Sequence, residues 1–94
     1  MAIIKVDYGE VGSKGTVVSE LVAAQASKSA VIKNGYYSIT DGSSSNLSNG
    51  TIVNGVLTKI YQNGTYCNAS YNSSTNTLSF TNNYNQVRFS YAAF

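Results

Sequence analysis

The stretch TLSFTNNYNQVRFSY, residues 77–91, decides the fold class. Apolar and polar side chains alternate in 77–81 and again in 86–91, the period of two that is typical of half-buried β-strands. Residues 82–85 stand between these runs and are three Asn and one Tyr, a composition that favours a turn. The stretch therefore predicts two strands joined as a hairpin. Their expected core residues are Leu78, Phe80, Val87, Phe89 and Tyr91.

The same pattern extends backwards to residue 51 and predicts a β-meander. Short apolar runs are separated by Asn54-Gly55, by Asn63-Gly64 and by the polar residues 72–76. An Asn-Gly pair suits the two positive-φ positions of a type I′ hairpin turn. Each strand is therefore expected to pair with the next one along the chain.

The first half of the chain gives weaker signals. Asn34-Gly35 predicts a further hairpin, between residues 30–32 and 36–39, and Asp41–Gly50 is expected to be a polar loop. The stretch 16–33 is ambiguous, because its β-branched residues favour strands whereas a Leu- and Ala-rich part favours helix. Extended structure is the preferred interpretation, and a short helix within 19–28 is the alternative.

The predicted fold class is a single small all-β domain, either an antiparallel β-sandwich or barrel-like, that spans residues 16–94. Residues 1–15 are expected to form an N-terminal strand or arm with a Gly-rich hinge. In this arm Ile4, Val6 and Tyr8 alternate with Lys5 and Asp7. Few charges protect the edges of the expected sheets, which favours a neighbouring chain as their cover.

Composition argues against most catalytic and binding classes. The chain has no His and one Cys, so a Cys–His or Ser–His nucleophile and a zinc site are not expected, and we predict neither enzymatic activity nor a cofactor. A Ser–Lys dyad has no supporting pattern. The six basic residues are scattered, so nucleic acid is not an expected partner. No apolar run approaches a membrane span, and the start lacks the pattern of a signal peptide.

The eight Tyr residues are the one positive functional feature. Tyr combined with Ser, Asn and Gly is the chemistry of contact surfaces, because rigid amphipathic rings accompany adaptable hydrogen bonds. Three interpretations stay open: cover for a sheet face, a protein–protein interface, and a glycan-binding surface. The candidate interface residues are Ile4, Val6, Tyr8, Tyr36, Tyr37, Tyr61, Tyr66 and Tyr84.

The opening residues MAIIKVDYGE, followed by Gly-rich sequence, resemble the start of small structural proteins of phages and prophages of Gram-positive bacteria. The charge-poor body, rich in Asn, Ser, Thr and Tyr, is similar to capsid decoration and tail accessory subunits. This resemblance implies a non-enzymatic virion protein that folds in the host cytoplasm. Its implied partners are further copies of itself or a larger virion lattice, and a glycan is the alternative partner.

Overall fold

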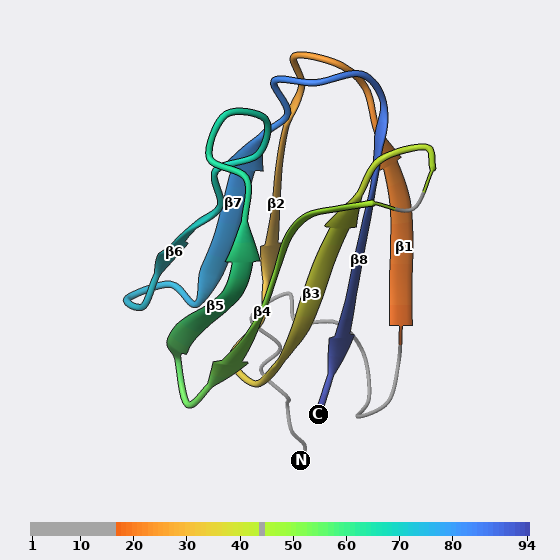
Figure 1. Cartoon of the computed structure of the whole chain (residues 1–94). Helices are drawn as coiled ribbons and strands as arrows, with labels where there is room; N and C mark the ends of the chain where they lie inside the picture. The colour runs from red at the N-terminus through yellow and green to blue at the C-terminus, as the bar shows by residue number, and fades with distance from the viewer. Residues whose placement is uncertain (1–16, 44) are drawn as a thin grey trace.

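The computed structural model of the chain describes residues 17–43 and 45–94, which form two antiparallel sheets packed face to face (Figure 1). The expected arm, with Ile4, Val6 and Tyr8, lies outside the described residues. Within them there is no helix, and the all-β sandwich is confirmed. The helix considered for 19–28 is replaced by two strands and a turn, in which Gln25 has a φ of 68°.

Five strands form one sheet in the order β1-β8-β3-β4-β5, and three form the other in the order β2-β7-β6. The strands are β1 (Val17–Val22), β2 (Ser27–Val31), β3 (Gly35–Thr40), β4 (Asn46–Val53), β5 (Val56–Gln62), β6 (Ser70–Asn72), β7 (Thr77–Thr81) and β8 (Val87–Ala93). Hairpins join β3 to β4, β4 to β5, and β6 to β7. The chain changes sheet at each of the other four connections.

The predicted meander is correct at two of its four connections, because Asn54-Gly55 and residues 72–76 do join paired strands. It is wrong at the other two, although their strands are present. The stretch 82–85 does not close a hairpin, because β7 pairs with β2 and β8 pairs with β1 and β3. Asn63-Gly64 likewise begins a passage from β5 to the other sheet. The predicted faces are correct for Leu78, Phe80, Val87 and Phe89, which are all buried. Tyr91 is half-buried against the same core.

The Asn34-Gly35 hairpin is also wrong, because β2 and β3 belong to different sheets. Gly35 is the first residue of β3, in the middle of the five-stranded sheet, and pairs with β4 on one side and β8 on the other. A Cβ at this position would collide with the carbonyl oxygen of Ala92. Glycine is needed here for close backbone approach, and not for a turn.

The predicted polar loop Asp41–Gly50 is mostly strand. Only residues 41–45 connect β3 to β4, and Asn46–Val53 pairs with β3 on one side and with β5 on the other. Two polar residues explain the error. Ser48 faces the core and hydrogen-bonds the Tyr37 hydroxyl at 2.7 Å, and Asn49 is held on the opposite face by Tyr36.

The Asn54-Gly55 turn is confirmed. Asn54 and Gly55 have φ values of 50° and 75°, and Val53 pairs with Val56 across them. These are the positive values that a type I′ turn requires. The turn between β6 and β7 also contains a positive-φ residue, Asn76, at 53°.

The core lies between the two sheets. Its buried residues are Val22, Ala30, Ile32, Tyr37, Ile39, Leu47, Ile52, Cys67, Ala69, Leu78, Phe80, Val87 and Phe89. The rings of Phe80 and Phe89 meet edge to face, with centroids 5.1 Å apart, and so link β7 to β8 across the sandwich. The sequence pattern predicts β7 and β8 as paired neighbours in one sheet, whereas in the structure they face each other across the core.

A buried amide organises the end of the sandwich where two connections cross between sheets. The Asn82 side chain is fully buried, and its Nδ2 donates to the carbonyl oxygens of Val22, Ala23 and Asn85 at 3.2, 3.1 and 2.7 Å. Its Oδ1 accepts from the Tyr84 backbone N–H at 2.9 Å. One side chain therefore satisfies backbone groups of both connections.

We predict that Asn82→Ala lowers the free energy of unfolding by about 3 kcal/mol, because each buried group left unpaired costs about 1–3 kcal/mol. Urea unfolding of both proteins measures the difference. Asn83→Ala is the matched control, since Asn83 is exposed and next in sequence, and it should change stability by about 0.5 kcal/mol or less. Equal effects of the two substitutions would contradict the role of Asn82.

Candidate interaction surfaces

Tyr37 is not an interface residue, which corrects the sequence prediction. Its side chain is 0% exposed and lies in the core. Burial raises the pKa of its hydroxyl, while the hydrogen bond to Ser48 acts in the opposite direction. Tyr36 lies on the other face of β3, because adjacent strand residues point to opposite faces.

The remaining candidate Tyr residues form two separate groups. Tyr36 and Tyr61 belong to the outer face of the five-stranded sheet, where they flank Asn49. Tyr66 and Tyr84 lie in connections between the sheets, and their rings are 4.5 Å apart. The structure does not bring the four together, and their interface role stays a prediction.

Strand β5 forms one edge of the five-stranded sheet and is its most apolar exposed element. Val56 and Ile60 are each 63% exposed, and Tyr61 is 47% exposed. The strand has seven residues and one charged side chain, Lys59. No described strand pairs with its outer side, so a row of backbone N–H and C=O groups is open to a partner. The sequence hint was the doubling of apolar residues, Val56-Leu57 and Ile60-Tyr61, which places apolar groups on both faces.

The other three edges carry features that discourage pairing. Strand β6 has only three residues. At the edges β1 and β2, Glu20 and Lys28 form an ion pair at 2.6 Å, and Glu20 also accepts from the Tyr91 hydroxyl at 3.3 Å. Short edges and charges directed inward are common protection against edge pairing. Strand β5 has one irregularity, a register shift against β4 that leaves Ile60 without a partner there, but it is long and carries no inward charge pair. It is therefore the least protected edge within the described residues.

Asn49 forms the second notable surface feature. Its Nδ2 donates to the Tyr36 hydroxyl at 3.1 Å, whereas no group of the described chain donates to its buried Oδ1. A buried acceptor without a partner costs about 1–3 kcal/mol. Tyr61 is the cross-strand neighbour of Asn49 in β5, and Ser38 is its neighbour in β3. Sequence reasoning missed Asn49, because it lay in the expected polar loop.

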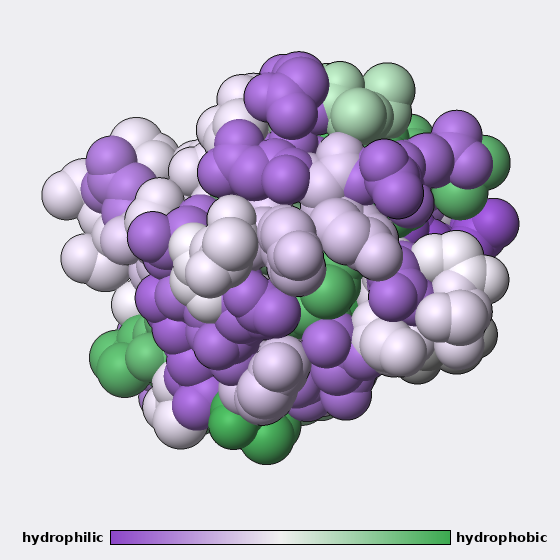
Figure 2. Space-filling view, turned by 45° about the horizontal axis from the view of Figure 1, so that its top comes forward, coloured by the Kyte–Doolittle hydropathy of each residue, from purple (hydrophilic) through white to green (hydrophobic). Residues whose placement is uncertain are grey.

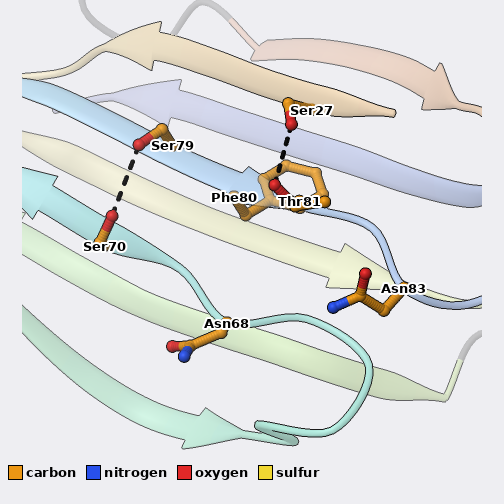
Figure 3. A pocket seen from close by; sticks show the side chains of 7 residues that line it. All are labelled: Ser27, Asn68, Ser70, Ser79, Phe80, Thr81 and Asn83. Carbon is orange, nitrogen blue, oxygen red and sulfur yellow. Dashed lines mark hydrogen bonds between the residues drawn. The ribbon is translucent and has the colours of Figure 1, made fainter. Parts of the chain in front are cut away.

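The outer face of the three-stranded sheet is lined by hydroxyl groups (Figure 3). The hydroxyl groups of Ser27 and Thr81 hydrogen-bond at 2.8 Å, and the hydroxyl oxygens of Ser70 and Ser79 lie 3.5 Å apart. Asn68 and Asn83 border a shallow depression over these residues. The ring of Phe80 is turned to the other side of the sheet, into the core. This face offers neutral polar groups without an exposed aromatic ring.

The connection between β3 and β4 is held by Asp41. Its Oδ1 accepts from the Ser43 N–H, the Ser43 hydroxyl and the Ser45 N–H at 2.8, 2.9 and 2.9 Å. These hydrogen bonds hold the pKa of this carboxyl below its usual value.

The face shown in Figure 2 is mostly hydrophilic, with separate hydrophobic spots and no continuous apolar patch.

Because the pKa of Asp41 is depressed in the folded protein, its contribution to loop order is present above the unfolded pKa. It should be lost as the pH falls through the folded pKa. We expect the backbone amide signals of Ser43 and Ser45 to shift together at acidic pH in an NMR titration. Asp41→Asn should abolish that transition. Its persistence in the variant would assign it to another group.

The described residues contain no cluster of three or more His, Cys, Asp or Glu side chains that could hold a metal ion.

Cys67 is fully buried in the core, where its backbone forms an isolated antiparallel β-bridge with that of Asn82. Burial raises the pKa of its thiol to about 11. The thiolate is the reactive form of cysteine, so this residue is a packing group in the folded protein.

We predict that the Cys67 thiol reacts with Ellman's reagent at pH 8 only after unfolding. In native protein the thiol should stay protonated and inaccessible, whereas in urea it should react within the mixing time. The absorbance of the released thionitrobenzoate measures both rates. Rapid reaction of the native protein would contradict the buried position.

The site and fold define a class of protein, a small antiparallel β-sandwich with an open apolar edge. No protein-family model, curated protein or solved structure matches the chain. No helix among the described residues is long and apolar enough to cross a membrane.

Proposed function

We propose that this protein is a non-enzymatic structural subunit that assembles through protein–protein contacts, with β5 as its contact strand. The observation that carries the proposal is the exposed, apolar edge of β5, with which no strand of the described part of the chain pairs. Soluble proteins usually protect such an edge, because it is a template for pairing with another chain. Pairing would bury Val56 and Ile60 and satisfy the open backbone groups.

The proposed occupant is β5 of a second copy, related by a two-fold axis. An axis beside Thr58 places Val56 of each copy opposite Ile60 of the other, and Leu57 opposite Lys59. The two most exposed aliphatic side chains of the strand then pair with each other. An axis beside Lys59 would place two like charges directly opposite, which is unfavourable. The sequence of β5 therefore favours the register centred on Thr58.

The setting that we propose for this subunit is a phage virion. The resemblance of residues 1–10 to virion proteins supports it, as does the charge-poor body rich in Asn, Ser, Thr and Tyr. A two-fold pair of sandwiches would extend one sheet across two copies and leave the other surfaces of each copy open to a lattice. Decoration and tail accessory subunits need such a combination of self-association and further contacts.

We predict that Ile60→Lys shifts the protein from dimer to monomer, with at least a tenfold rise in the dissociation constant. The substitution loses apolar burial and adds a second charge to each strand; about 1.4 kcal/mol is enough for a tenfold change. Sedimentation equilibrium over a concentration series measures the constant. Leu21→Lys on β1 is the matched control, since Leu21 is exposed to 56% on the opposite edge. If the wild type is monomeric at high concentration, the proposed self-assembly fails.

A cysteine placed on the proposed axis tests the register. In Thr58→Cys the two new thiols face each other, and directly opposed strand residues have Cα atoms about 4.5–5.5 Å apart, within the disulfide range of about 4.4–6.8 Å. Mild oxidation should give a covalent dimer on a non-reducing gel. Val56→Cys is the control and should stay uncrosslinked. In this register Val56 lies opposite Ile60 of the second copy, so the two Val56 positions are four residues apart along the paired strands. The reverse result would replace this register with another.

A further inference from the structure

Asn49 points to a ligand-binding function that the β5 edge does not require. It is only 7% exposed, although its side chain lies on the outer face of the sheet. Its neighbours Ser48 and Gly50 both face the core. Ser48 hydrogen-bonds the Tyr37 hydroxyl there, and a Cβ added to Gly50 would meet the Tyr37 ring. The Nδ2 of Asn49 donates to the Tyr36 hydroxyl, and Tyr61 is the residue opposite Asn49 in β5. Its Oδ1 has no donor among the described residues.

The chemistry of the unpaired atom selects the kind of partner. Rotating the Asn49 amide by 180° would let the Tyr36 hydroxyl donate to Oδ1, and would leave an unpaired N–H in its place. In either orientation one polar atom of the amide has no partner within residues 17–43 and 45–94. A hydroxyl group can donate or accept, so it suits both. A ligand rich in hydroxyl groups is therefore the best match.

The described residues that surround Asn49 are aromatic or neutral polar. Its outer-face neighbours on the adjoining strands are Ser38 and Tyr61, and Thr51 and Thr58 pair next to them. Lys59 pairs with Gly50 and thus alternates onto the other face. Flat aromatic rings pack against the apolar faces of sugar rings, and a neutral site offers no attraction to acidic groups.

We propose that Tyr36, Asn49 and Tyr61 form a binding site for a neutral carbohydrate. The Tyr61 ring, which is 47% exposed, moves aside and stacks on the sugar, and a sugar hydroxyl donates to Asn49 Oδ1. The Tyr36 hydroxyl, which can accept or donate, holds the other polar atom of the amide. The site lies on the outer face of the sheet, whereas strand pairing would use the edge, so both can operate in one molecule.

A glycan array of neutral oligosaccharides is the first test, followed by calorimetric titration with the strongest binder. We expect Asn49→Ala and Tyr61→Ala each to weaken binding about tenfold, the effect of losing one good contact. Tyr66→Ala is the matched control, an exposed Tyr in the separate Tyr66–Tyr84 group, and should bind like the wild type. All titrations are repeated in the Ile60→Lys background, so that loss of self-association is not mistaken for loss of the glycan site.

The thermal midpoint of Asn49→Ala distinguishes a binding role from a structural one. Removing an unsatisfied buried amide should leave the midpoint unchanged or raise it, while binding falls. Three results would overturn the proposal: no glycan bound at about 10 mM, a range weaker than ordinary specific binding; binding that neither substitution weakens; or a folded Asn49→Ala protein whose midpoint drops together with binding. If Asn49→Ala does not fold, Tyr61→Ala still decides the matter.

Discussion

The sandwich depends on the hydrogen bonds of one buried side chain, the amide of Asn82. Two connections cross between the sheets at the same end, and both leave backbone groups inside the protein. The backbone of Asn82 exchanges hydrogen bonds with the β1–β2 connection, through Gln25 and Ala26 at 2.8 and 2.9 Å. Its side chain satisfies further carbonyls on both crossings. Buried polar groups are nearly always paired, and the Asn82 amide supplies partners to backbone groups at both crossings.

This constraint explains which part of the fold could be predicted from the sequence. The period-two pattern identifies strands and their buried faces, and it does so correctly for Leu78, Phe80, Val87 and Phe89. It carries no information about which strand lies alongside. Residues 82–85 suit a hairpin turn as well as a crossing, because Asn is favourable in both. The choice follows from the carbonyls of Val22 and Ala23, which are about sixty residues away in sequence.

The candidate surfaces could likewise be predicted only in part. Alternation correctly separates Tyr36 from Tyr37, since adjacent strand residues face opposite ways. Composition alone could not show that Tyr37 would be the buried one, because that depends on Ser48 meeting its hydroxyl inside the core. Ser48 and Asn49 lie in a segment whose polarity indicated a loop. Their strand is stabilised by β-pairing on both sides and by two Tyr hydroxyls, which are tertiary contacts that no local window contains.

Asn82 and Asn49 are both buried amides, and they differ in what they do for the isolated chain. All the polar atoms of the Asn82 side chain have partners, so the residue stabilises the folded monomer. Among the described residues one polar atom of Asn49 has no partner, and the exposed apolar residues of β5 are likewise unfavourable in water. Unfavourable features of this kind are typically retained where binding relieves them. The opposite energetic signs of two otherwise similar residues therefore separate the scaffold of this protein from its proposed binding surfaces.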